Sequence, residues 1–268
     1  MSRRLLHRAF SRALFAGQIR RPKCFVLGNQ KSGTSAIGNL ISIASGLSYG
    51  QDVLYFSGKP LIDSLHDGSL SISELKRKHP YVFAYGVVKD PNLAFWTQDL
   101  SLRFPSARQV AIVRDPFQNI RSIFNRLNLD GRTTRLDRTQ LEGSVAERWI
   151  QYLEGHYHGH SDPNPVKVMA LRWSSMNQSI LQNANSIKIV KYEDFVRDKT
   201  STIQDVLKHL ELKQVHAIEQ HVNTQFQPAG DPNLNLNEFF GAENLQVIRS
   251  VCGPAANKLK YEWTHNEC

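Results

Sequence analysis

The stretch Cys24–Ile41, CFVLGNQKSGTSAIGNLI, decides the fold of this 268-residue chain. Its first four residues are apolar and predict a buried strand, and the residues from Thr34 onward carry Ile37, Leu40 and Ile41 at helical spacing. A glycine-containing loop joins these two segments. A strand, such a loop and a helix start form a cradle for phosphate, because backbone N–H groups and the positive end of the helix dipole face the anion. We therefore predict an anion-binding site in this stretch.

The spacing of the loop distinguishes it from the Walker A loop of ATP-binding proteins. In that loop, G-x-x-x-x-G-K-[ST], the lysine follows the second glycine, and the next hydroxyl group holds magnesium. Here Gly28 and Gly33 keep the interval between the glycines, but Lys31 precedes Gly33 by two residues. The ammonium group is therefore expected near the middle of the loop, where it reaches a bridging or leaving oxygen without an adjacent magnesium site.

A second motif places an arginine at the end of a strand. Val110–Val113 predicts a buried strand that ends at Arg114, and a helix is expected to begin near Pro116 and to carry Ser122. The planar guanidinium group of arginine binds phosphate oxygens in a forked geometry. This motif therefore predicts a second group that contacts phosphate.

The chain alternates strand-like and helix-like stretches between and after these motifs. Ile187–Phe195 begins as a short apolar strand and contains Tyr192, and Tyr81–Val88 predicts a further buried strand followed by Lys89. Such alternation is typical of a parallel sheet with helices on both faces, where ligands gather at the carboxyl ends of the strands. We predict one α/β domain with three layers over residues 22–268.

In combination, these motifs resemble those of the PAPS-dependent sulfotransferases, whose bacterial-type members have a P-loop-like α/β fold. The usual loop of that family is Pro-Lys-Ser-Gly-Thr-Thr-Trp. This chain has Gln30 in place of the proline, and Ser35 and Ala36 in place of the final threonine and tryptophan. The tryptophan of the family stacks on the adenine, so this departure leaves that stacking contact open.

The resemblance implies a role for each matching residue. Lys31 would stabilise the leaving oxygen, Arg114 and Ser122 would hold the 3′-phosphate, and Tyr192 would lie near the adenine. PAPS would be the co-substrate, and no metal would be needed. The donor-binding residues implied in this way are Lys31, Ser32, Gly33, Thr34, Ser35, Arg114, Ser122 and Tyr192.

The hydroxyl group of the acceptor needs a general base in such a reaction. The base of the family often follows the strand between the two cofactor motifs, so Asp90 is predicted to be catalytic together with Lys31. An aspartate with an ordinary pKa is a weak base near neutral pH, and Lys-Asp-Pro also occurs as a turn that ends a strand. His66 and Asp63 are the alternatives. They lie on a segment expected, like residues 128–165, to recognise the acceptor.

Composition limits the partners of the protein. The 33 Lys and Arg exceed the 24 Asp and Glu, and a formal net charge of +9 suits a phosphorylated co-substrate, a nucleic acid or an anionic membrane. No zinc-finger spacing or aromatic RNA-binding strand is present, which argues against nucleic acid.

The three cysteines show no paired spacing, which favours a reducing compartment such as the cytoplasm. His156, His158 and His160 alternate without a second half-site, so we expect a solvated loop rather than a metal site.

Residues 1–21 form a separate basic segment by composition. Residues 1–51 contain no Asp or Glu, and in the first 21 residues arginines interleave with leucine and phenylalanine at roughly helical spacing. The apolar run is too short for a transmembrane span or a secretory signal. Three interpretations stay open, which are a basic helix packed on the domain, a helix on an anionic membrane surface, and a mitochondrial-type presequence.

These observations predict a cytoplasmic sulfotransferase that transfers a sulfuryl group from PAPS to a hydroxyl group. The acceptor would be a glycan, a lipid or a small-molecule alcohol. One alternative is a nucleotide or small-molecule kinase that uses ATP and magnesium, although the position of Lys31 argues against it. The other is a non-catalytic nucleotide-binding protein that contacts a membrane through residues 1–21.

Overall fold

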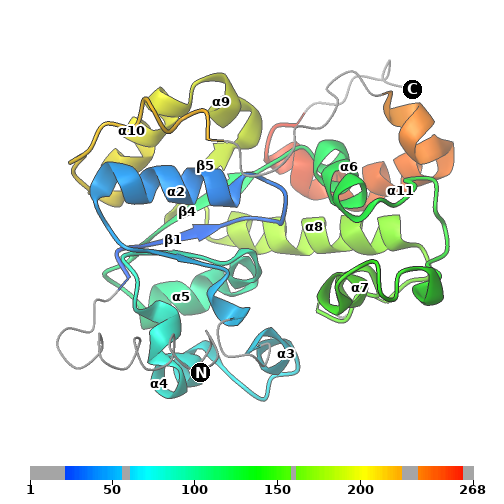
Figure 1. Ribbon diagram of the computed structural model, residues 1–268, viewed down its shortest axis with the longest axis horizontal. Coiled ribbons are helices and arrows are strands. Elements are labelled where there is room, and N and C mark those ends of the chain that lie inside the picture. Colours follow the sequence, from blue (N-terminus) through cyan, green and yellow to red (C-terminus); the bar gives the residue numbers. More distant parts are fainter. Residues whose placement is uncertain (1–21, 56–60, 158–160, 225–234, 262–268) are drawn as a thin grey trace.

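A five-stranded sheet runs through the middle of the described residues, which are 22–55, 61–157, 161–224 and 235–261 of this computed structural model (Figure 1). The basic segment 1–21 lies outside the described residues. The strands are β1 (Cys24–Leu27), β2 (Tyr49–Gln51), β3 (Val87–Lys89), β4 (Arg108–Val113) and β5 (Ile187–Lys191). Their order is β2-β3-β1-β4-β5, and every neighbouring pair is parallel. The predicted α/β class with a parallel sheet is therefore confirmed.

Side chains of the central strands alternate between two hydrophobic layers. In β1, Cys24 and Val26 belong to one layer, and Phe25 and Leu27 belong to the other. All four are fully buried. This pattern follows from the two-residue period of a strand and from helices that cover both faces of a parallel sheet.

One face of the sheet is covered by the helix of the phosphate loop and by two later helices. They are α2 (Thr34–Ser45), α9 (Tyr192–Arg197) and α10 (Lys199–Leu210). Helix α2 begins at the predicted residue and buries Ile37, Leu40 and Ile41. It ends at Ser45, and the positive φ of 65° at the following residue, Gly46, lets the chain leave the helix.

The remaining helices contribute side chains to the hydrophobic cluster on the opposite side of the sheet. They are α3 (Leu61–His66), α4 (Ile72–Lys78), α5 (Thr97–Arg103), α6 (Pro116–Leu127), α7 (Glu147–Leu153), α8 (Pro165–Gln182) and α11 (Leu236–Lys258). Short 3₁₀ helices are η1 (Val53–Tyr55), η2 (Pro80–Phe83), η3 (Pro91–Trp96) and η4 (Arg138–Gln140). The long helix α8 runs beside the sheet toward α11 (Figure 1). Within the described ranges, no helix has both the length and the apolar composition that a membrane crossing requires.

The predicted strand Tyr81–Val88 is wrong over its first half. Pro80–Phe83 forms η2, and only Val87–Lys89 pairs as β3. Proline lacks an N–H group and has a fixed φ, so it fits the first turn of a helix. Val82 and Phe83 are nevertheless buried, because this turn packs in the core. A short apolar run does not distinguish these two structures.

Candidate functional site at the phosphate loop

The loop from Gly28 to Gly33 joins β1 to α2 at the carboxyl end of the sheet. The φ angles of Gly28, Lys31 and Gly33 are 135°, 67° and 91°. A Cβ atom at Gly28 would lie 2.2 Å from the carbonyl oxygen of Ile112, so the loop passes too close to β4 for a side chain. The left-handed conformation of Lys31 costs about 1–3 kcal/mol and must be held by its surroundings.

The first turn of α2 offers donors for an anion. Its N-cap residue, Gly33, makes no side-chain capping bond, and the first turn carries no acidic residue. The first backbone N–H groups of a helix have no acceptor within the helix, and the helix dipole places positive charge there. The buried Thr34 and the half-buried Ser35 add hydroxyl groups to this turn. The local structure is therefore the strand, loop and helix start that the sequence predicted, while its binding of phosphate stays a prediction.

A buried asparagine on α6 holds the loop through hydrogen bonds. The Nδ2 atom of Asn119 donates to the carbonyl oxygen of Gln30 at 2.8 Å and to Oγ of Ser32 at 3.0 Å. Its Oδ1 atom accepts a hydrogen bond from Nδ2 of Asn29 at 2.9 Å. Asn119 is fully buried. These bonds hold the loop in place before a ligand binds, which reduces the cost of ordering it.

Arg114 and Tyr192 reach the loop from two neighbouring strand ends. Nη1 of Arg114 donates to the carbonyl oxygen of Lys31 at 2.9 Å, and the guanidinium carbon lies 4.4 Å from the centre of the Tyr192 ring. A Cβ atom at Gly33 would lie 2.8 Å from that ring, so the tyrosine packs against the loop. Nε of Arg114 is buried and has no hydrogen-bond partner among the described residues. The structure thus brings the three predicted motifs together and leaves Arg114 with an unused donor.

Three cations gather at the loop. Burial, together with the charges of Arg126 and Arg114, lowers the pKa of Lys31 to about 8. In the described part of the chain, none of the three forms an ion pair with a carboxylate. Like charges held together without a counter-charge are costly, and a bound anion would relieve that cost.

Arg126 was missed by sequence reasoning. It lies in the last turn of α6, four residues after Ser122, so both residues are on the same face of the helix. Ser122 itself is half-buried. The interval of four residues between Ser122 and Arg126 was the feature of the sequence that could have identified Arg126.

Asp90 follows β3 and is fully buried. Its Oδ2 atom accepts the N–H of Leu54 at 3.0 Å, and its Oδ1 atom accepts the backbone N–H and the side-chain amide of Asn92 at 3.0 and 2.9 Å. Burial and the charge of Asp52 raise the pKa of Asp90 to about 6. The carboxylate therefore caps the turn into η3, and it also titrates much closer to neutral pH than an ordinary aspartate.

The alternative bases lie on α3. Burial and the charge of Arg172 lower the pKa of His66 to about 3, so its imidazole is neutral at physiological pH and a weak base. Asp63 is hydrogen-bonded to the hydroxyl group of Tyr157. His66 is therefore poorly suited to accept a proton, and the carboxylate of Asp63 already has a hydrogen-bond partner.

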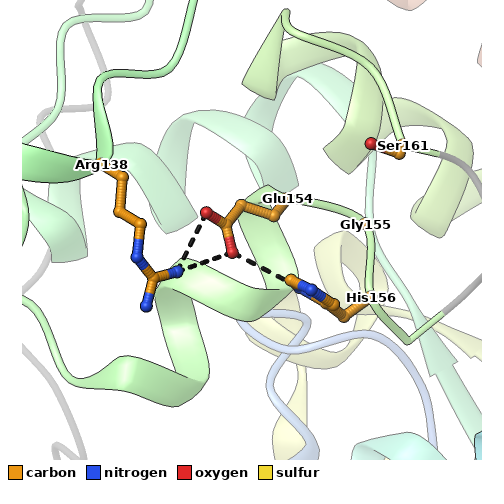
Figure 2. A pocket seen from close by; sticks show the side chains of 5 residues that line it. All are labelled: Arg138, Glu154, Gly155, His156 and Ser161. Atoms are coloured by element: carbon orange, nitrogen blue, oxygen red, sulfur yellow. Dashed lines mark hydrogen bonds and ion pairs between the residues drawn. The ribbon is translucent and has the colours of Figure 1, made fainter.

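A separate surface hollow of about 690 Å³ lies over α7 and is lined by Arg138, Glu154, Gly155, His156 and Ser161 (Figure 2). Nη1 of Arg138 lies 3.0 and 2.8 Å from the two carboxylate oxygens of Glu154, and Nδ1 of His156 lies 3.4 Å from Oε2. None of the predicted site residues lines this hollow. His156 is exposed, whereas His158 and His160 lie outside the described residues. Among the described residues, no group of three His, Cys, Asp or Glu is placed to hold a metal ion.

The sequence matches the family model described as "Sulfotransferase family" over residues 59–216, which is more than half of the chain. The chain belongs to the sulfotransferase family. The matched segment begins after the phosphate loop and includes Asp90, Arg114 and Tyr192. Among curated proteins, no sequence matches this sulfotransferase significantly.

Solved sulfotransferase structures share its fold. The protein is similar to the sulfotransferase STF9 from Mycobacterium avium, with a TM-score of 0.56, 11% sequence identity, and coverage of 97% of this chain and 82% of that chain. It is also similar to the sulfotransferase domain from the curacin biosynthetic pathway, with a TM-score of 0.51, 15% identity, and coverage of 92% and 100%. At these identities, the likeness shows the fold alone. The match to the family model confirms the resemblance at the level of the family, and the solved structures confirm the fold.

Proposed function

We propose that this sulfotransferase uses PAPS as donor and the hydroxyl group of a glycan, lipid or small-molecule alcohol as acceptor. The observation that carries the proposal is the meeting of Lys31 and Arg114 at the uncapped start of α2, where neither cation forms an ion pair with a carboxylate of the described residues. PAPS bears a phosphosulfate and a second phosphate on one adenosine, so it requires two linked anion sites. The loop and α2 suit the phosphosulfate, while the unused Nε of Arg114 and the adjoining Tyr192 ring suit the 3′-phosphate and the adenine.

The chemistry requires one bond to break and another to form at sulfur. The acceptor oxygen attacks the sulfur atom, the bond from sulfur to the bridging phosphate oxygen breaks, and negative charge develops on that oxygen. The Lys31 ammonium group is the cation that would stabilise this charge, and a fixed charge is effective because it needs no reorganisation. We propose that the proton of the acceptor passes to Asp90, whose raised pKa suits a base. Because Asp90 is fully buried, this role requires the acceptor hydroxyl group to reach it in the loaded site.

The rate is expected to show a bell-shaped dependence on pH. Asp90 must be ionised, so kcat/KM should rise as the pH passes through about 6. Lys31 must be protonated, so kcat/KM should fall as the pH passes through about 8. Initial rates between pH 5 and pH 9.5 at constant ionic strength would measure both limbs. Asp90→Asn should remove the acid limb and lower the plateau. If the acid limb near pH 6 persists in this variant, Asp90 is not the base, and its role is limited to capping the turn.

Titration calorimetry with 3′,5′-adenosine bisphosphate, the expected product, tests the choice of donor. We expect binding in the presence of EDTA that is tighter than the binding of ATP with magnesium. Tighter binding of ATP with magnesium, or binding of the bisphosphate only with a metal, would overturn the proposal in favour of the kinase. A positive result would justify a screen of alcohols with PAPS.

Contact with an anionic membrane through residues 1–21 stays a prediction from the arginine and leucine pattern of that segment. The cytoplasmic location is a prediction from the cysteine pattern. Binding of the full chain to vesicles of neutral and anionic lipid would measure the membrane contact directly.

A further inference from the structure

Arg172 is a buried cation that forms no ion pair with a carboxylate among the described residues. It lies on α8 and is 1% exposed. Its Nε and Nη2 atoms donate to Oε1 of Gln30 at 3.2 and 3.1 Å, and Nη2 also donates to Oδ1 of Asn92 at 2.8 Å. Both acceptors are neutral amides, and Nη1 is buried with no partner in the described part of the chain. A charge buried without a counter-charge lowers the stability of the folded protein, so a functional role is a reasonable explanation for its presence.

The guanidinium group is fixed in one orientation. Its central carbon lies 4.4 Å from the centre of the Tyr152 ring and 5.1 Å from that of the Phe95 ring. Aromatic rings beside a guanidinium group stabilise it and limit its rotation. The fork of Arg172 is therefore held toward Gln30.

Gln30 precedes Lys31 in the loop, and each of its polar groups has a partner. Oε1 accepts the two bonds from Arg172, and Nε2 donates to Oδ1 of Asn92 at 3.3 Å. Its backbone N–H donates to Oδ1 of Asn29, and its carbonyl oxygen accepts from Asn119. The proline usual in the family at this position fixes φ through its ring. Here a side chain anchored by an arginine supplies the restraint.

This anchor lies beside the strained residue of the loop. Lys31 has a φ of 67°, and such a conformation persists only where neighbouring contacts determine it. Arg114 holds the carbonyl oxygen of Lys31 on one side, and Arg172 holds the preceding side chain on the other. Asn92 also donates to Asp90, so the same network joins the loop to the turn that carries the proposed base.

We propose that Arg172 is a positioning residue that holds Lys31 in its left-handed conformation through Gln30. The catalytic consequence rests on the proposed function, because it requires Lys31 to face the leaving oxygen. The positioning itself concerns only the loop, so it is measurable without turnover.

Replacement of Arg172 by methionine separates this role from a purely structural one. We expect kcat with PAPS to fall about 10²-fold, because a small displacement of a catalytic group has an effect of that order. The melting temperature should change little, because removal of a buried charge offsets the loss of the donors to Gln30 and Asn92. Gln30→Met should lower kcat similarly, and the double variant should lose no more than the single ones. Arg108→Met is the matched control, since Arg108 pairs with Glu211 at the opposite end of β4.

The pKa of Lys31, followed by NMR of its side chain, tests the positioning without activity. We expect it to rise from about 8 toward the ordinary value of about 10.4 in Arg172→Met, because the ammonium group leaves its partly buried place. Arg172→Lys keeps the positive charge but loses the forked guanidinium group. The same rise of the Lys31 pKa in this variant would therefore result from the changed position of Lys31 and not from the loss of a charge.

An unchanged Lys31 pKa in both variants would overturn the proposal. So would wild-type kcat in Arg172→Met, or a loss of kcat that follows a loss of melting temperature. If the wild-type protein neither binds the bisphosphate nor uses PAPS, the proposed function fails, while the Lys31 titration still decides the positioning.

Discussion

Replacement of Lys31 by methionine is expected to lower kcat for sulfuryl transfer by about 10²–10³-fold. The ammonium group lies in the middle of a loop already fixed by Asn119 and Arg114, so it meets developing charge without reorganisation. The affinity for the bisphosphate product should fall less than about ten-fold, because the N–H groups of α2 remain to bind phosphate. Steady-state rates with PAPS and an accepted alcohol, together with calorimetry, measure the two effects separately.

Lys188→Met is the control for this substitution. Lys188 is a partly exposed lysine on β5 that pairs with Asp205, so the variant removes an equal charge elsewhere. It should keep kcat within about two-fold, since exposed ion pairs contribute little. A Lys31→Met protein with wild-type kcat would remove Lys31 from the chemistry. A loss confined to the KM for PAPS would reduce its role to ground-state binding.

The strand, loop and helix around Lys31 could be predicted because local chemistry determines them. Glycines at positions 28 and 33 permit positive φ angles, and the apolar period after Thr34 gives the helix its buried face. The meeting of Arg114 and Tyr192 could be predicted for a different reason. Both follow strands of a parallel sheet, and the carboxyl ends of such strands share one edge.

The supports of the site could not be predicted in the same way. Arg172 and Asn119 lie inside helices, and their roles arise from contacts with a loop more than 80 residues away in sequence. Nothing in the residues beside Arg172 distinguishes a buried arginine from an exposed one. Similarly, the turn at Asp90 is visible in the sequence, but the shift of its pKa depends on complete burial beside Asp52.

The phosphate contacted by Arg114 can be identified by comparing two nucleotides. We expect Arg114→Met to weaken binding of 3′,5′-adenosine bisphosphate by about 10²-fold, because the 3′-phosphate would lose its charged hydrogen-bond partner. Adenosine 5′-monophosphate lacks the 3′-phosphate, so its affinity should change only a few-fold. Arg114→Lys should not restore the lost affinity, because an ammonium group cannot form the forked contact.

Arg197→Met is the matched control for this experiment, since Arg197 is an exposed arginine that pairs with Asp194 three residues away. It should leave both affinities unchanged. Equal weakening of both nucleotides by Arg114→Met would contradict contact with the 3′-phosphate. It would assign Arg114 to the support of the loop through the carbonyl oxygen of Lys31, a bond that the structure already contains. A loss of affinity for the bisphosphate alone would instead identify the 3′-phosphate as the hydrogen-bond acceptor of the buried Nε of Arg114, which has no partner among the described residues.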